Sequence, residues 1–403
     1  MGSISVRLNF ASLIIVAVLF GLSIGIYDLL FPYYLDDLGV SFTSMGILFS
    51  VAALVIAFAS VYIASASDVR GRKDYYSLGI LLGSLSSFIA PLFTALPILV
   101  VSKTFREAAV NFRASLHGVL IYEFARGKFA DFWAKSRGIE YLSEGSGQLI
   151  AGFLLITIGF TGSFFMAGLF FVASLLVFTL GFREARSPGS GGSPPSIRES
   201  FSLDLPVPLI LLAASAFIFA VGLSVSHTFI LPLFFAKKFG ATVGQVSLIL
   251  GLHRISFVPL LISGRVVKYS LKRVYIISML FEGIVISSSG LIPGLFLSAA
   301  IWLTHDVLGA SIWLPAQASL IQHYARNEFR GKDVSRVRAI GALGWIFGPL
   351  IAGWAAQVSI SLPFIISGII VASSIVPIIF VRDPETAPEL RIGGPGTTRT
   401  RKA

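Results

Sequence analysis

Apolar segments of about twenty or more residues recur along the chain, separated by short polar breaks. A helix of about twenty apolar residues spans the hydrocarbon core of a bilayer. The pattern predicts twelve transmembrane helices, at residues 10–35, 44–66, 75–94, 96–122, 138–160, 163–182, 206–235, 243–264, 273–292, 295–322, 338–358 and 361–381. The first segment is too long for a cleaved leader and has no small-residue cleavage pattern, so we expect it to remain as a helix.

The segment at residues 96–125 has the length of a membrane span but carries several ionisable residues, namely Lys103, Arg106, Glu107, Arg113 and His117. At about 100° per residue, all five fall within an arc of about 120°. A charge at the bilayer centre costs about 2.5–3.5 kcal/mol on insertion scales, so this face must meet a polar or ion-paired interior. The alternative is a helix in an interfacial or cytoplasmic loop, which the ordered arc disfavours.

Composition indicates an all-α polytopic membrane protein. Of the 403 residues, 55% are hydrophobic and only 13% are charged, whereas soluble domains carry about 25% charged residues. Nearly all loop lysines and arginines fall on the side of the N-terminus, and the opposite loops hold only Lys237 and Lys238. The positive-inside rule therefore predicts a multi-pass protein of the cytoplasmic membrane with both termini in the cytoplasm. This distribution also explains the net charge of +11 without a nucleic-acid partner.

The chain repeats itself at an offset of 200 residues, which predicts two similar bundles. Residues 28–32 (DLLFP) match 228–232 (TFILP), and 148–152 (QLIAG) match 349–353 (PLIAG) with one residue of drift. A polar break rich in Gly, Ser and Pro separates the repeats and is typical of a flexible linker. We therefore expect a six-helix bundle at residues 1–182, a cytoplasmic linker at 183–205, a second bundle at 206–381 and a disordered tail at 382–403. Duplicated bundles around a midplane site are typical of secondary transporters.

The loop after the second predicted helix carries Asp68, Gly71, Arg72 and Lys73. With these residues the chain resembles the major facilitator superfamily, whose loop between helices 2 and 3 reads Gly-x-x-x-Asp-Arg-x-Gly-Arg-Arg. Ala64 replaces the first glycine and Val69 the first arginine. The resemblance implies a gating loop that latches the two bundles in one access state; an ordinary basic loop is the alternative. In the second repeat, Lys268 occupies the aspartate position, which weakens a symmetric latch.

Further motifs extend the resemblance over the whole chain. Arg106 stands where the family has an arginine in helix 4, although Val110 replaces the usual glycine. Helices 5 and 11 resemble the glycine-rich antiporter motif through Gly147, Gly152, Gly348, Pro349 and Gly353, with Gln148 where helix 5 is expected to have proline. Small residues also permit close helix packing, so a coupling role and a packing role both remain open.

The family fold implies that helices 1, 4, 7 and 10 line a central cavity. Ionisable residues within a membrane avoid lipid, and those of this chain fall largely on these helices. The predicted cavity residues are Asp28, Lys103, Arg106, Glu107, Arg113, His117, Glu144, His227, Arg254, His305 and Asp306. Glu282 in helix 9 is the exception, for which we expect at most an interhelical hydrogen bond.

A buried carboxylate with an incomplete set of partners can load and release a proton. Asp28 and Glu107 are the candidates, and static ion pairs are the alternative. At its depth Arg106 can reach Asp28, so we predict that this pair changes with protonation. Because Arg106 and Glu107 lie about 100° apart around the helix, we expect that they need not pair and that Glu107 faces the substrate.

Together these features predict a secondary transporter that moves a small organic solute by alternating access, coupled to protons. The sequence leaves open whether it works as an efflux antiporter or an uptake symporter, and whether the solute is an organic anion or an amphipathic cation. A transport-inactive sensor or partner protein is the alternative function. We expect a monomer in the lipid bilayer that is no enzyme and has no cofactor. We also expect no metal site, because no His or Asp cluster has metal-ligand spacing and the adjacent His305 and Asp306 should point to different faces.

Overall fold

The computed structural model of the protein describes residues 3–125, 129–184, 198, 203–256, 258–259, 270–326 and 329–383. Helices fill most of these ranges. They are α1 (Ser3–Asp37), α2 (Phe42–Arg70), α3 (Arg72–Ile89), η1 (Ala90–Leu92), α4 (Leu96–Ala125), α5 (Phe129–Gly181), α7 (Val207–His227), α8 (Ile230–Phe239), α9 (Val243–Ser256), α11 (Leu271–Leu291), α12 (Leu295–Thr304), the π-helical turn η4 (His305–Ala310), α13 (Ser311–Tyr324), α14 (Arg330–Ala342), α15 (Gly344–Val358), α16 (Leu362–Ser373) and α17 (Ile375–Ile379).

Within the described residues, each of the twelve predicted spans overlaps helical structure; residues 257 and 260–264 of the span 243–264 lie outside them. In the described part of the chain, nine helices are long and apolar enough to cross a membrane. Helix α5 is one of them and holds two predicted spans, 138–160 and 163–182. Helices α4 and α9 are not among these nine. Helix α4 carries too many charged residues, and only 14 residues of α9 are described. The arrangement is therefore consistent with twelve transmembrane helices.

Local backbone conformation explains where several helices break. Gly159 has φ 69° and ψ −176°, which separates the two spans within α5. This positive φ suits glycine because it lacks a Cβ atom. The predicted span at 206–235 is interrupted at Thr228, between α7 and α8. At the start of α2, the Ser41 side chain accepts a hydrogen bond from the Ser44 backbone N–H at 3.2 Å and so caps the helix.

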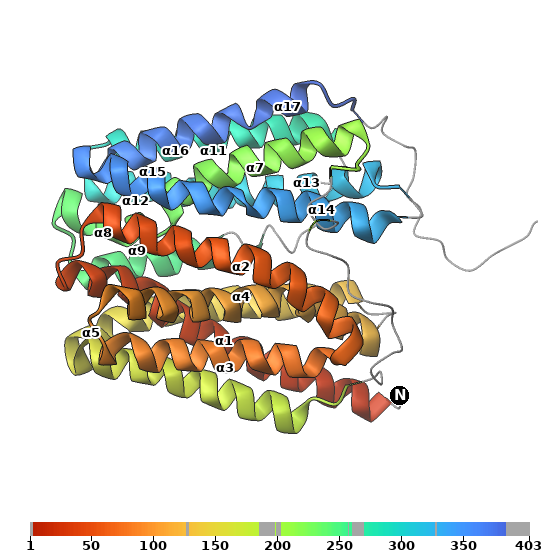
Figure 1. The fold of residues 1–403 in the computed structure, drawn as a ribbon. Helices are drawn as coiled ribbons and strands as arrows, with labels where there is room; N and C mark the ends of the chain where they lie inside the picture. Colours follow the sequence, from red (N-terminus) through yellow and green to blue (C-terminus); the bar gives the residue numbers. More distant parts are fainter. Residues whose placement is uncertain are drawn as a thin grey trace, which may run out of the picture.

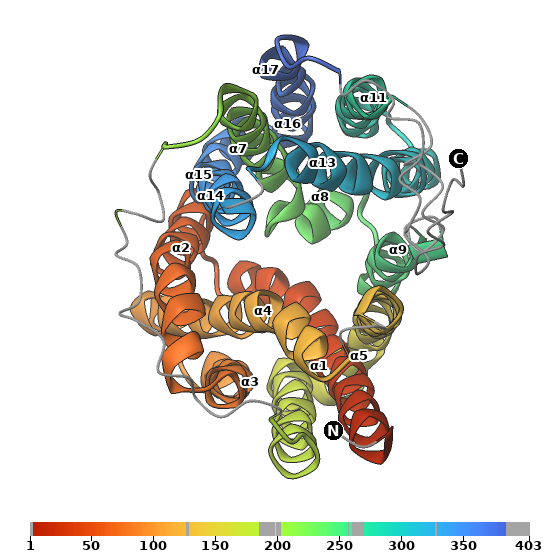
Figure 2. The same cartoon turned by 90° about the vertical axis from the view of Figure 1, so that its right-hand side faces the viewer.

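The helices form two bundles that lie side by side (Figure 1). Helices α1 to α5 pack against one another, and so do α7 and α11 to α17. Two pairs join the bundles: α2 packs against α15, and α5 packs against α9. Viewed from the end that bears the N-terminus, the two groups of helices surround a central region (Figure 2).

Matching contacts support the internal repeat. The Lys73 Nζ donates to the Thr179 carbonyl oxygen at 2.7 Å, and the Lys272 Nζ donates to the Ile379 carbonyl oxygen at 2.8 Å. Gly39 and Gly240, which follow α1 and α8, both have positive φ, 71° and 63°. These pairs lie about 200 residues apart, as the sequence repeat does. The bundle boundaries at 182 and 206 remain a prediction, because most of the linker at 183–205 and of the tail at 382–403 lies outside the described residues.

The predicted orientation can be tested without background labelling, because the chain has no native cysteine. We expect single cysteines at Ser41, Thr94 and Ser359 to react with a membrane-impermeant maleimide added outside intact cells, since these residues lie in breaks on the side with few basic residues. Cysteines at Ser190 and Thr397, both outside the described residues, should react only after the cells are permeabilised. Outside labelling at Ser190 would contradict the assignment of two six-helix bundles.

Candidate functional site

A cavity of about 550 Å³ lies between the two bundles. Its wall includes residues of α1, α2, α4 and α5 from the first bundle and of α7, α8, α9 and α13 to α15 from the second. Near the end of α1, a Lys237–Asp36 ion pair of 2.8 Å joins the bundles. Between α2 and α15, Ser50 Oγ donates a hydrogen bond to the Ile346 carbonyl oxygen at 2.5 Å. Both contacts connect the first bundle to the second.

Four charged residues of α1 and α4 form a connected network on the cavity wall. Arg106 forms an ion pair with Asp28 through Nη2 and Oδ2, as the sequence predicts. Glu107 Oε1 lies 2.7 Å from Lys103 Nζ and 2.8 Å from Arg106 Nη1. Arg106 and Glu107, which we expected need not pair, do pair here, because two long side chains reach across the 100° that separates them on the helix. Glu107 lines the cavity, as predicted.

This network has spare hydrogen-bonding capacity. The Oδ1 atom of Asp28 is buried without a hydrogen-bond partner in the described part of the chain, and so is Nε of Arg106. The Lys103 Nζ lies 4.4 Å from the centroid of the Phe49 ring, which gives its charge an aromatic neighbour as well as Glu107. A buried carboxylate with one unpartnered oxygen is a place where a proton or a polar substrate group can bind.

A second group of charges, which centres on Glu140, lies nearer the N-terminal end. The side chain of Arg113 is only 1% exposed and forms an ion pair with Glu140. Arg137 Nη1 contacts the other oxygen of Glu140 at 2.7 Å. The sequence analysis missed Glu140 and placed Arg137 in a loop. Glu140 lies four residues before Glu144 and so on the same face of the helix. This spacing could have identified Glu140 as a residue of the polar interior.

His117 lies away from the cavity wall. Its Nε2 is 2.8 Å from Ser136 Oγ, its Nδ1 is 3.3 Å from the Tyr76 hydroxyl, and the side chain is buried among α3, α4 and α5. Among the described residues, the cavity lining includes neither His117 nor Arg113. Both residues were predicted to line the cavity. They instead lie in the polar interior of the first bundle, behind the cavity wall.

Two predicted cavity residues connect the bundles to each other. Glu144 Oε1 of α5 lies 2.8 Å from Arg254 Nε of α9. Near this ion pair, a Cβ atom added to Gly145 would meet the Gly251 carbonyl oxygen, so the two backbones approach closely there. This ion pair, in which the Arg254 side chain is 32% exposed, crosses the α5–α9 interface.

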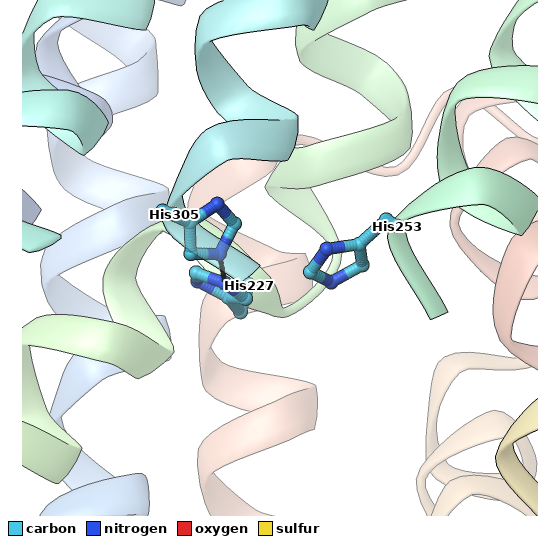
Figure 3. Close-up of side chains that lie close together, drawn as sticks. All are labelled: His227, His253 and His305. Atoms are coloured by element: carbon cyan, nitrogen blue, oxygen red, sulfur yellow. Dashed lines mark hydrogen bonds between the residues drawn. The ribbon is translucent and has the colours of Figure 1, made fainter. Parts of the chain in front are cut away.

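Three histidines converge beside the cavity in the second bundle (Figure 3). His227 of α7 and His305 of η4 face each other with their Nε2 atoms 3.0 Å apart, and His253 of α9 points toward this pair. Asp306 contacts Nδ1 of His253, and its other oxygen lies 3.5 Å from Nε2 of His305. The expectation that His305 and Asp306 point to different faces is wrong, because both side chains meet His253 and each other across the angle between them.

The predicted gating loop contacts the first bundle in this conformation. Gly71 has φ 109°, which a side chain would disfavour, and it separates α2 from α3. Arg72 pairs with Glu123 of α4, and Lys73 Nζ donates to the carbonyl oxygens of Thr179 and Phe182, both at 2.7 Å. The side chain of Asp68 and the second-repeat residue Lys268 lie outside the described residues.

The motif glycines lie where backbones approach closely. A Cβ atom on Gly147 would meet Leu22 of α1, and one on Gly152 would meet Ser247 of α9. On α15, a Cβ atom on Gly348 would meet Ser224 of α7, and one on Gly353 would meet Phe42 of α2. The carbonyl oxygen of Pro349 lies against Gly46 of α2. These contacts support the packing role of the two motifs, within each bundle and across the interface.

Glu282 of α11 is 1% exposed and packs against Gly309 of the π-helical turn. Its Oε2 atom has no hydrogen-bond partner among the described residues. It therefore belongs to the structure behind the histidine cluster rather than to the cavity wall.

A family model described as "Major Facilitator Superfamily" matches residues 13–269 and 212–402. Among curated proteins, the chain is similar to "Multidrug resistance protein 2" of Bacillus subtilis (strain 168). The two are 24% identical over 372 residues, which cover 87% of this chain and 89% of the relative.

Solved structures share the fold at low sequence identity. A crystal structure of the nucleoside transporter NupG superimposes with a TM-score of 0.77 at 12% identity and covers 92% of this chain and 98% of its own. A D-xylose-proton symporter gives 0.74 at 15% identity, with 95% and 99% covered. A bacterial homologue of the human lysosomal transporter Spinster, in an inward-facing conformation, gives 0.69 at 14% identity, with 94% and 96% covered.

Glu140→Ala should destabilise the protein strongly, because it leaves Arg113 charged and buried without its carboxylate. Breaking a buried ion pair costs about 3–5 kcal/mol, which thermal unfolding of purified protein in detergent would show as a lower midpoint. Asp36→Ala is the matched control, because it removes a partly exposed partner and should change stability by less than about 1 kcal/mol. Equal midpoints for the two variants would contradict the structural role of Glu140.

Proposed function

This chain belongs to the major facilitator superfamily and moves a small solute across a membrane, and we propose that it does so by alternating access coupled to protons. The compared proteins are transporters rather than enzymes. The observation that carries the proposal is the cavity between the bundles with the charged network on its wall. In this proposal, a solute enters the cavity from the end that bears the N-terminus. The Lys237–Asp36 and Ser50–Ile346 contacts between the bundles then separate as the bundles rock.

The Asp28–Arg106 pair is the proposed coupling element. Protonation neutralises Asp28 and removes its attraction to Arg106, so the guanidinium interacts more strongly with Glu107 or with a substrate. The unpartnered Oδ1 of Asp28 gives the proton a place to bind. In this scheme Glu107, which lines the cavity between two cations, contacts the substrate. Static ion pairs remain the alternative, and a proton-dependence measurement distinguishes the two.

For the substrate we propose amphipathic organic molecules of drug size, exported in exchange for protons. The similarity to a protein named for multidrug resistance supports this class. The cavity wall supports it physically, because aromatic and aliphatic side chains such as Phe31, Phe49 and Trp345 stand beside both cations and carboxylates. A wall with both signs of charge accepts polar groups of either sign. We propose that the protein acts as a monomer in the cytoplasmic membrane, with both termini in the cytoplasm.

Transport by purified protein in liposomes tests this function. A pH gradient is imposed across the vesicle membrane, and the movement of a hydrophobic cation, an organic anion, a nucleoside and a sugar is followed. Antiport predicts that drug-like compounds cross the membrane in the direction opposite to the protons, and that reversing the pH gradient reverses the direction in which the compounds move. Movement in the direction of the protons would indicate symport instead. No movement of any compound would favour a transport-inactive sensor or partner protein.

Asp28→Asn should leave substrate binding measurable while abolishing the dependence of transport on the pH gradient, because the neutral amide cannot exchange a proton. Binding is measured on purified protein, and gradient-driven flux is measured in liposomes. Asp36→Asn is the matched control, since it changes the same residue type eight residues along, at the partly exposed end of α1. If Asp28→Asn retains full proton-driven transport, the proton carrier is instead Glu107 or Asp306.

Asp68→Asn should slow transport several-fold with little loss of folded protein, because it changes a loop charge that the family motif uses to latch the bundles. Lys268→Ala, at the equivalent position of the second repeat, should have a smaller effect, because this repeat departs from the motif. Flux per folded protein in liposomes gives the measurement. A flux equal to that of the unmodified protein for Asp68→Asn would rule out the latch.

A further inference from the structure

The histidine cluster has the composition of a transition-metal site. His227, His253 and His305 come from three separate helical elements, and each offers one nitrogen within 4.8 Å of the others. His253 and His305 are buried, and His227 is partly buried beside the cavity. Because the residues are spread over 79 positions of the chain, only the fold brings them together.

Hydrogen bonds at Nδ1 orient the three rings. Nδ1 of His305 contacts the Trp302 carbonyl oxygen, and Nδ1 of His253 contacts the Asp306 carboxylate. Both partners accept hydrogen bonds, so a neutral ring carries its hydrogen on Nδ1 and keeps a lone pair on Nε2 for a ligand. Nδ1 of His227 lies 3.1 Å from the Leu223 carbonyl oxygen and 2.9 Å from the Ser226 hydroxyl, so its contacts are compatible with either tautomer, including the one with a free Nε2 lone pair.

Two of the ring nitrogens face each other. The Nε2 atoms of His227 and His305 are 3.0 Å apart. Without a metal, one of these nitrogens donates a hydrogen bond to the other; a metal ion bound to both would take the place of the shared hydrogen. Two imidazole nitrogens at about 2.0–2.1 Å from a tetrahedral zinc ion lie about 3.3 Å apart, so this separation needs little adjustment to bind one.

We propose that His227, His253 and His305 bind one divalent transition-metal ion of the zinc class on the wall of the cavity. Imidazole nitrogens favour zinc, copper, nickel and iron over magnesium and calcium, which prefer oxygen ligands. Asp306 supports the site through Nδ1 of His253, the carboxylate–histidine–metal arrangement that orients a ligand and raises its basicity. His227 and His253 line the cavity, so a fourth position is open to water or to a solute.

The charges around the cluster are compatible with a bound cation. Asp306 supplies a carboxylate at the site, and Glu282 lies behind the same π-helical turn against Gly309. The nearest cation in sequence, Arg254, forms an ion pair with Glu144 of the other bundle. A bound metal would join α7, α9 and η4 within the second bundle, so its presence would stiffen the cavity wall. This proposal is independent of proton coupling, because it concerns binding alone.

The test uses the full-length protein in detergent, purified without a polyhistidine tag and treated with a chelator. The protein is incubated with zinc, desalted and analysed for metal by mass spectrometry, and cobalt is used as a spectroscopic probe. We expect one zinc per chain, and a cobalt absorption spectrum with the intense visible bands of a tetrahedral site that contains nitrogen ligands. Less than a tenth of a zinc per chain would overturn the proposal and would indicate that the two facing histidines share a proton instead.

Variants distinguish the cluster from other histidines without relying on transport. His227→Ala and His305→Ala should each abolish stoichiometric binding, and Asp306→Asn should weaken it about 10- to 100-fold, the range observed when a supporting carboxylate is lost. His323→Ala, at a histidine outside the cluster on α13, is the control and should bind zinc as the unmodified protein does. Retention of zinc by His305→Ala would overturn the assignment. If a variant fails to fold, the melting temperature of the unmodified protein still tests the site. We expect zinc to raise this temperature and magnesium not to raise it. No rise with zinc would count against the site.

Discussion

The charges of α4 dominate the structure, because a helix that crosses a membrane with three cations on one face needs a partner for each of them. Asp28 of α1 and Glu140 of α5 supply two of these partners, and Glu107 of α4 itself supplies the third. Each partner requires its helix to lie within contact distance of α4. The need to neutralise charge in a medium of low dielectric constant therefore fixes the order of helices around the centre of the first bundle.

Sequence reasoning predicted much of this arrangement. The helical spans and the Asp28–Arg106 contact followed from the spacing of apolar and charged residues, because lipid imposes a simple rule on which side chains it tolerates. The internal repeat followed from matching segments, and the family from the resemblance of the loop that carries Asp68, Gly71, Arg72 and Lys73. Glu140 was missed because it lies close to the predicted start of its helix, where a charge reads as part of a loop. His117 was placed on the cavity wall because angle alone does not give the distance from the bundle axis.

The histidine cluster shows where such reasoning ends. His227, His253 and His305 have no local spacing in common, so no motif identifies them. His305 begins a π-helical turn, His305–Ala310, and the sequence pattern of an α-helix does not reveal the extra residue that makes such a turn. The two bundles thus differ in chemistry despite their similar sequences: the first has guanidinium and carboxylate groups at its centre, and the second has a cluster of imidazoles.

The contacts that join the two bundles have unequal physical character. The Lys237–Asp36 pair has side chains 39% and 33% exposed, so dissolved ions screen it and its strength falls with ionic strength. The approach of Gly46 of α2 to the Pro349 carbonyl oxygen of α15, in contrast, depends on steric fit, which dissolved ions do not weaken. Raising the salt concentration therefore weakens one of these contacts and leaves the other unchanged.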